Sequence, residues 1–220
     1  MGESGDTTVR EPEHVDPEGP GDDRAQALAE ETLRRRAAAL EHIRKFGDPV
    51  LKSRAAEIKS FGPELEREAR RMIAIMRDAI GVGLAATQLG VMHRLLVFQA
   101  GPDASPTAVA NPVIEWLSDE EVIAEEGCLS LPRIAVDVER PLFARVGGVD
   151  ITGEPLEIEA SGLEARVLQH EIDHLDGVLM LDRAPRDQRK AALRALREGG
   201  EYGPSSEEPA EEDSPAPAAS

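Results

Sequence analysis

The alternation of apolar and polar residues predicts short strands in the middle of the chain, with helices before and after them. Residues 63–80 start with proline and carry apolar residues largely on one face of a helix that ends before Gly81. Residues 31–46 also have helical composition, and a Gly-Asp-Pro turn follows them. Six runs have the composition of strands, namely residues 94–98, 107–110, 121–124, 135–138, 143–146 and 155–158.

A further amphipathic helix is predicted between Ser161 and Gly177. Ser161 and Glu164 fit a capping box, in which each side chain accepts a hydrogen bond from a free amide at the helix start. Gly177 can end the helix in the left-handed conformation. We therefore expect an α+β fold in a single domain, with mixed or antiparallel strands packed around this central helix.

The helix contains the sequence HEIDH, which places two histidines one turn apart. At 100° per residue, His170 and His174 point within about 40° of each other, on the stripe that also carries Leu163 and Val167. We expect this stripe to face the core, so that both imidazoles point inward. Asp173 could orient a histidine that binds a metal, but it lies at an outward angle, and we expect a solvated carboxylate there.

Two histidines at this spacing can bind one divalent metal ion, and Glu171 between them can act on a metal-bound water. The alternative is a pair of core histidines beside a solvated glutamate. A catalytic site of this type needs a third protein ligand. Either Cys128 supplies a thiolate, or Glu198 supplies a carboxylate as in metallopeptidases. Cys128 is the chain's one cysteine, and a small buried apolar residue is its other interpretation.

The glycine-rich sequence GVGLAATQ spans residues 81–88. It is unlike a dinucleotide-binding loop, because it follows a predicted helix and leads to a strand, the reverse of the order that such a loop requires. Small residues would let the backbone approach a bound molecule closely, with the Gln88 amide beside it. Tight packing of a strand against the HEIDH helix explains the glycines equally well.

Charge divides the chain into three parts. The net charge is −18, and residues 1–30 hold nine acidic residues against two arginines. Residues 199–220 hold six acidic residues and no basic one. Both ends are rich in Pro, Gly, Ser and Ala, a composition that buries too little apolar surface to fold. We expect disordered acidic extensions over 1–30 and 199–220, and a catalytic domain over 31–198.

Composition excludes several classes of protein. No stretch approaches the about 18 to 20 apolar residues of a membrane helix, and the acidic start is unlike a signal peptide. A single cysteine makes no internal disulfide. Direct nucleic-acid recognition is not expected, because phosphate contacts need clustered Lys and Arg. We expect a cytoplasmic protein that does not bind membranes.

Three segments together resemble the motifs of bacterial peptide deformylases, in the same order and at similar separations. They are GVGLAATQ, EEGCLSLP (residues 125–132) and QHEIDHLDG (residues 169–177). Supporting matches are FGDPVL near the start, Asn111-Pro112, and Arg140. The resemblance covers roughly residues 43–185. It is strongest to an actinobacterial type, while the acidic extensions have no counterpart in the minimal family pattern.

The resemblance implies a metal held by Cys128, His170 and His174, and so it favours Cys128 over Glu198. Fe²⁺ is then the expected ion, with Zn²⁺ or Ni²⁺ able to replace it. The expected reaction removes the formyl group from the formyl-methionine of newly synthesised polypeptides. The implied roles are general base for Glu171, oxyanion binding for Gln88 and the Leu129 amide, and peptide binding for the backbone at Gly83 and a Glu126-Gly127 turn.

Two other functions remain open at this stage. The first is a metallopeptidase that cuts internal peptide bonds with HEIDH and a downstream glutamate. The second is a protein without enzymatic activity, in which the histidines hold a structural ion with four protein ligands. Residues 188–197 also predict a last amphipathic helix, which in a deformylase would be a possible contact with the ribosome.

Overall fold

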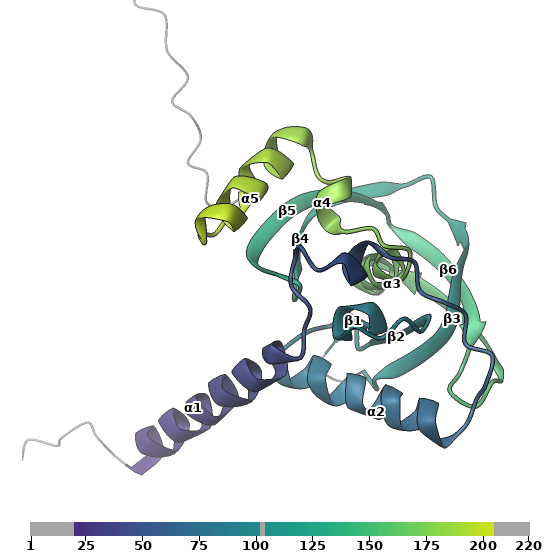
Figure 1. The fold of residues 1–220 in the computed structure, drawn as a ribbon, viewed down its shortest axis with the longest axis horizontal. Coiled ribbons are helices and arrows are strands. Elements are labelled where there is room, and N and C mark those ends of the chain that lie inside the picture. Colours follow the sequence, from purple (N-terminus) through teal and green to yellow (C-terminus); the bar gives the residue numbers. More distant parts are fainter. Residues whose placement is uncertain (1–19, 102–103, 205–220) are drawn as a thin grey trace, which may run out of the picture. The chain divides into compact units, whose positions relative to one another are not determined.

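The computed structural model describes residues 20–101 and 104–204 (Figure 1). In chain order, the elements are α1 (Pro20–Glu41), η1 (Pro49–Lys52), α2 (Pro63–Asp78), β1 (Gly83–Ala85), η2 (Ala86–Leu89), β2 (Leu95–Phe98), β3 (Thr107–Leu117), β4 (Glu121–Cys128), β5 (Leu131–Pro141), β6 (Phe143–Val149), β7 (Pro155–Ser161), α3 (Gly162–Leu175), α4 (Met180–Arg183) and α5 (Arg186–Glu198). Within the described residues, no helix is both long and apolar enough to cross a membrane.

The strands form two antiparallel groups. Five of them make one sheet in the order β1-β2-β3-β6-β7, and β4 and β5 form a separate hairpin. All six predicted strands are present, and most extend beyond their predicted ends. The expected α+β class with antiparallel strands is therefore confirmed.

The short strand β2 shows why the five-stranded sheet is buried on both faces. All four of its residues are apolar and at most 4% exposed. Successive side chains of a strand point to opposite faces. Leu95 and Val97 accordingly pack in the cluster of α2, whereas Leu96 and Phe98 pack in the cluster of α3. The sheet thus separates two helices, and α3 has its position fixed by apolar contacts along its length.

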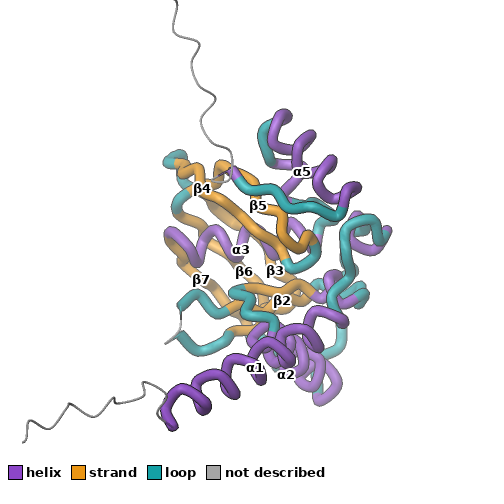
Figure 2. Tube along the Cα trace, turned by 90° about the vertical axis from the view of Figure 1, so that its left-hand side faces the viewer, coloured by secondary structure: helices purple, strands orange, loops and turns teal. Residues whose placement is uncertain are grey.

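Helix α3 lies between the sheet and the β4–β5 hairpin (Figure 1). The outer side of the hairpin carries α4 and α5, whose Met180, Leu181 and Ala192 pack against apolar residues of β5 (Figure 2). The strands therefore surround the HEIDH helix as predicted, with β4 bringing Cys128 to it.

The sequence predicted the C-terminal cap of α3 correctly but not its N-terminal cap. Ser161 is the N-cap residue, but its side chain makes no capping hydrogen bond, so the predicted capping box is wrong. Ser161 instead ends β7 in an extended conformation, and its neighbour Gly162 bonds to Leu142 of the sheet. At the other end Gly177 has a φ of 74°, and the Val178 amide donates to the Asp173 carbonyl. The left-handed glycine cap is thus confirmed.

Both expected domain limits, at residues 31 and 198, lie within the described residues. Helix α1 begins at Pro20, within the segment predicted to be disordered, because residues 24–41 are rich in the helix formers Ala, Glu, Leu and Arg. The chain divides into two compact units at Arg34. At the C-terminal end, Tyr202 pairs with β5, beyond the expected limit at 198. The remaining parts of the predicted extensions, 1–19 and 205–220, lie outside the described residues.

Candidate metal centre and catalytic cavity

Three potential metal ligands meet where β4 ends beside α3. The ligand atoms of Cys128, His170 and His174 all lie within 4.8 Å of one another. Cys128 Sγ is 3.2 Å from His174 Nε2, and the two imidazole rings are 4.9 Å apart. A thiolate and two imidazoles are a suitable donor set for a divalent transition metal. Glu198 is not part of this group, since it lies at the exposed end of α5 and pairs with Arg194.

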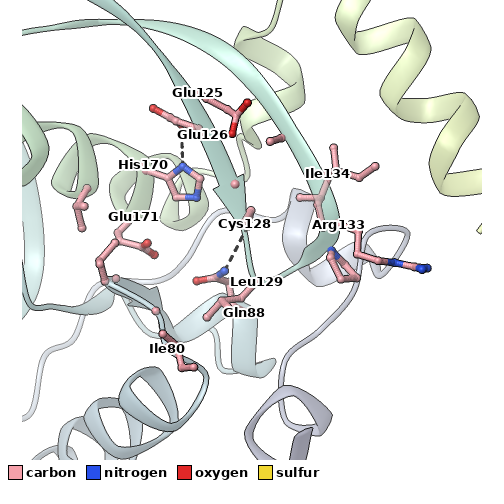
Figure 3. A pocket seen from close by; sticks show the side chains of 18 of the residues that line it. Ile80, Gln88, Glu125, Glu126, Cys128, Leu129, Arg133, Ile134, His170 and Glu171 are labelled. Atoms are coloured by element: carbon pink, nitrogen blue, oxygen red, sulfur yellow. Dashed lines mark hydrogen bonds and ion pairs between the residues drawn. The ribbon is translucent and has the colours of Figure 1, made fainter. Parts of the chain in front are cut away.

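His170 is oriented by a buried carboxylate. Its Nδ1 lies 2.9 Å from Oε2 of Glu126 (Figure 3). Arg140 donates to both oxygens of Glu126, and Arg166 donates to Oε1. A partner on Nδ1 leaves Nε2 of the imidazole for a metal, the usual arrangement around metal-binding histidines.

This arrangement corrects one expectation about Glu126 and Gly127. The two residues do not form a turn, because both belong to β4 and pair with Val136 and Ala135 of β5. The Glu126 side chain is 5% exposed and is engaged by His170 and the arginines. Only the backbone at this place remains a candidate for peptide binding.

Asp173 is also buried, so its predicted exposure to solvent is wrong. Arg140 donates to Oδ2 of Asp173 at 2.9 Å, and Arg183 of α4 binds both carboxylate oxygens. The helical angle of Asp173 does point away from the cavity. On that side of α3, however, Arg140 of the hairpin and Arg183 of α4 contact the carboxylate. An unbroken chain of ionic contacts therefore joins Arg183, Asp173, Arg140, Glu126 and His170.

Charges in this cluster set the protonation of its members. Burial opposes ionisation of Glu126, but hydrogen bonds from Arg140 and His170 lower its pKa far below the usual range. Burial likewise disfavours the Cys128 thiolate, yet the charges of His174 and His170 bring the pKa of the thiol well below its ordinary value. This lowered pKa favours the thiolate of Cys128, the form that binds metals. Burial raises the pKa of Glu171.

Glu171 lies against the glycine-rich segment. A Cβ atom at Gly83 would be 2.5 Å from Oε1 of Glu171, so only glycine leaves room for this carboxylate. The glycines therefore permit strand β1 to pack against the HEIDH helix, one of the two interpretations of that sequence. Among the described residues, Oε2 of Glu171 is buried and has no hydrogen-bond partner. That oxygen is available to accept a proton from a group in the cavity.

Gln88 is held with its amide nitrogen toward the metal ligands. It lies in η2 and is 2% exposed. Its Oε1 accepts from the Ala85 amide, and its Nε2 lies 3.6 Å from Cys128 Sγ and 3.3 Å from Ser130 Oγ (Figure 3). Leu129 follows Cys128 directly, and its carbonyl accepts from Lys45. Gln88 and Leu129 thus face the same space as the thiolate.

A cavity of about 640 Å³ opens beside these groups. Gly83, Gln88, Cys128, Leu129, His170 and Glu171 all contribute to its lining. Leu163 lies on the same wall and is 57% exposed, so the prediction that it faces the core is wrong. The stripe of α3 passes from the buried Val167 into the cavity mouth. An accessible space beside a potential metal site is typical of a catalytic centre.

Three protein ligands, a buried carboxylate and an amide donor around one cavity define the class of metal-dependent hydrolases. A model of the polypeptide deformylase family matches residues 40–190. The chain belongs to this family. Its match agrees closely with the extent of the resemblance in the sequence, and with a divalent metal at the Cys/His/His site.

Individual relatives agree with this assignment. Peptide deformylases of Parafrankia sp. and Acidothermus cellulolyticus are 43% and 45% identical over 160 residues, which is 73% of this chain and 87% of each relative. A solved peptide deformylase of Synechococcus elongatus with actinonin is 38% identical, with a TM-score of 0.68 over 72% of this chain and 87% of that one. The enzyme of Thermotoga maritima is 46% identical, with a TM-score of 0.63 over 65% and 96%.

Proposed function

We propose that this protein hydrolyses the formyl group from the N-terminal formyl-methionine of new polypeptides and releases formate. One observation carries the proposal: Glu171 and Gln88 flank the Cys128, His170 and His174 cluster on a single accessible cavity. A hydrolase of this kind needs a metal, a base and an oxyanion donor at one point. Membership of the family supports the same reaction.

Each side chain has a role in the proposed reaction. When a divalent ion is bound by Cys128 and the two histidines, it supplies Lewis acidity, which lowers the pKa of water toward about 7. Glu171 accepts the proton of the attacking water and returns it to the leaving amine. The Gln88 amide and the Leu129 N–H bind the negative charge that develops on the formyl oxygen. Loss of one such donor typically slows a reaction by about 10² to 10³.

The peptide would bind as an extended strand across the cavity. We propose that its backbone pairs with the chain at Gly83 on one side and at Gly127 on the other, as in strand addition. Both glycines line the cavity. The exposed Leu163 and Val82 give the same walls an apolar surface suited to a methionine side chain.

We propose Fe²⁺ as the working ion, with Zn²⁺ or Ni²⁺ able to replace it. A thiolate ligand beside iron makes Cys128 open to oxidation by air. Protein purified without oxygen should therefore be more active than protein purified in air. Equal activity of both preparations, at equal iron content, would argue against iron.

The central test measures formate released from formyl-Met-Ala-Ser and free amine released from acetyl-Met-Ala-Ser. A deformylase acts on the first and leaves the second largely intact. An unformylated protein substrate distinguishes a metallopeptidase from a deformylase. A metallopeptidase would cut the internal peptide bonds of this protein and release no formate. Metal analysis combined with a chelating inhibitor tests the alternative of a structural ion in a protein without enzymatic activity. Such an ion would have four protein ligands and no open position, so the inhibitor would not bind to it.

We also propose a cytoplasmic location and a contact between α5 and the ribosome. The helix exposes five basic side chains, two of which have acidic partners in Asp182 and Glu198. Ribosome pelleting compares the full chain with a variant in which Arg186, Lys190 and Arg197 are changed to glutamate. The control replaces Glu30 and Glu31 with lysine, which changes the net charge in the opposite direction at a place outside α5. Equal pelleting of the parent and the glutamate variant would refute the contact.

A further inference from the structure

The segment after α5 returns to the catalytic cavity. Gly199 ends α5 with a φ of 70°, and its carbonyl accepts from Arg133 of β5. The chain then runs beside β5. The Tyr202 amide donates to the Arg133 carbonyl at 3.0 Å, and the Ala135 amide donates to the Tyr202 carbonyl at 2.7 Å. Two backbone hydrogen bonds therefore fix Tyr202 on the free edge of β5.

Tyr202 forms part of the cavity wall. It is half-buried, packs against the apolar cluster of β5, α4 and α5, and lines the cavity together with Leu131 and Ile134. The metal ligands, Gln88 and Glu171 all lie within residues 40–190, the part that matches the family. Tyr202 lies outside that match.

The position of Tyr202 matches the course of a bound peptide. Its neighbour Ala135 stands opposite Gly127 in the hairpin, and Gly127 precedes Cys128. Tyr202 pairs with Ile134, the residue before Ala135, so it lies two strands away from Gly127, with strand spacings of about 4.8 Å. Tyr202 lies roughly 10 Å from Gly127, about the length of three residues of extended peptide. The first residue of a peptide whose formyl group lies at Cys128 is therefore too close to Cys128 to contact Tyr202, and about the third residue is the first that can reach it.

We propose that Tyr202 is a specificity-determining residue that contacts the side chain of the third residue of the formylated peptide. The contact favours large apolar or aromatic side chains, which pack against an aromatic ring over Leu131 and Ile134. The proposal rests on the proposed deformylase function. It predicts that this chain distinguishes substrates by a residue remote from the bond that breaks.

Kinetics of Tyr202→Ala test the contact with formyl-Met-Ala, formyl-Met-Ala-Ser and formyl-Met-Ala-Phe. We expect a loss in kcat/KM of about five- to tenfold for the last peptide, mainly through KM, and less than twofold for the first. Tyr202→Phe keeps the ring and should restore the parent value. Trp116→Ala is the control, since it removes an exposed aromatic ring outside the cavity lining. An equal loss on all three peptides would assign Tyr202 a structural role and overturn the proposal.

A second measurement needs no substitution. Tyr202 is the chain's one tyrosine, so 3-fluorotyrosine labelling gives a single ¹⁹F resonance from the metal-loaded protein. The product peptide Met-Ala-Phe should shift this resonance, whereas Met-Ala should not. If neither peptide changes the chemical shift of this resonance at saturation, the contact is refuted. Because this readout requires binding alone, it remains informative if no formate is released, an outcome that would refute only the deformylase function.

Discussion

Glu126→Gln is the most direct test of how the metal centre is held. The carboxylate accepts four donors: two from Arg140, one from Arg166 and one from His170. Glutamine has the same shape, but one of its two terminal atoms becomes an NH₂ group that cannot accept. Two hydrogen bonds are then lost, and the new N–H groups face other donors.

The expected magnitude has two parts. Arg140 is 2% exposed, so loss of its charged partner leaves a buried cation that Asp173 alone must balance. Breaking a buried ion pair typically costs about 3–5 kcal/mol of unfolding free energy. His170 also loses a fixed orientation. Loss of such a partner lowers metal affinity by about 10- to 100-fold, or roughly 1.4–2.7 kcal/mol.

Two assays measure these parts separately. Thermal unfolding of the metal-free protein reports the loss of stability, and competition with a chelator reports the metal affinity of the folded protein. Glu121→Gln is the matched control, because it makes the same charge change at an exposed position of the same strand. If Glu126→Gln binds metal as tightly as the parent, Glu126 does not orient His170.

Further predictions concern individual side chains. Glu171→Ala should keep the metal but lose most formate release, and Cys128→Ala should lose the metal, as elemental analysis would show. Gly83→Ala should cut turnover at least tenfold with metal content unchanged, because its Cβ takes the place of the Glu171 carboxylate; normal turnover would contradict this packing. Burial opposes ionisation of Asp182, but the hydrogen bond from Lys52 lowers its pKa. Lys52→Met should therefore cost about 0.5 kcal/mol at pH 7, a difference that denaturant titrations should see vanish as the pH falls below about 4. Persistence of the full difference at pH 3 would contradict the ion pair.

Local patterns explain how much of the fold could be predicted. Helix α2 and strand β2 follow from apolar periodicity, because each buries a defined face or both faces. Strand β1 was not among the six predicted strands and was only one of two interpretations of the glycine-rich sequence, since its three residues Gly-Leu-Ala have neither β-branched nor aromatic side chains. It exists because it pairs with β2 and packs against α3. Such a strand depends on tertiary contacts that no local pattern carries.

The site shows the same division. His170, Glu171 and His174 share one helix, so their grouping followed from spacing alone. Cys128 joined them through the resemblance, and the structure brings its sulfur to His174. Arg183 could not be found in this way, because its partner Asp173 lies on another element. The helical angle of Asp173 gave its direction correctly. What covers that direction is decided by the hairpin and α4.

The ionic chain behind His170 also explains why so many charges are buried in so small a protein. A carboxylate that orients a metal-binding imidazole must stay ionised and fixed. Burial removes the water that would stabilise its charge, so another charged group has to do so. Arg140 compensates Glu126, and Asp173 compensates Arg140 in turn. The series ends at Arg183, whose side chain is 45% exposed, so water solvates the last charge. The support of the metal centre therefore extends from α3 through the hairpin to α4, and the surface at Arg183 is the point at which a buried network can end without an uncompensated charge.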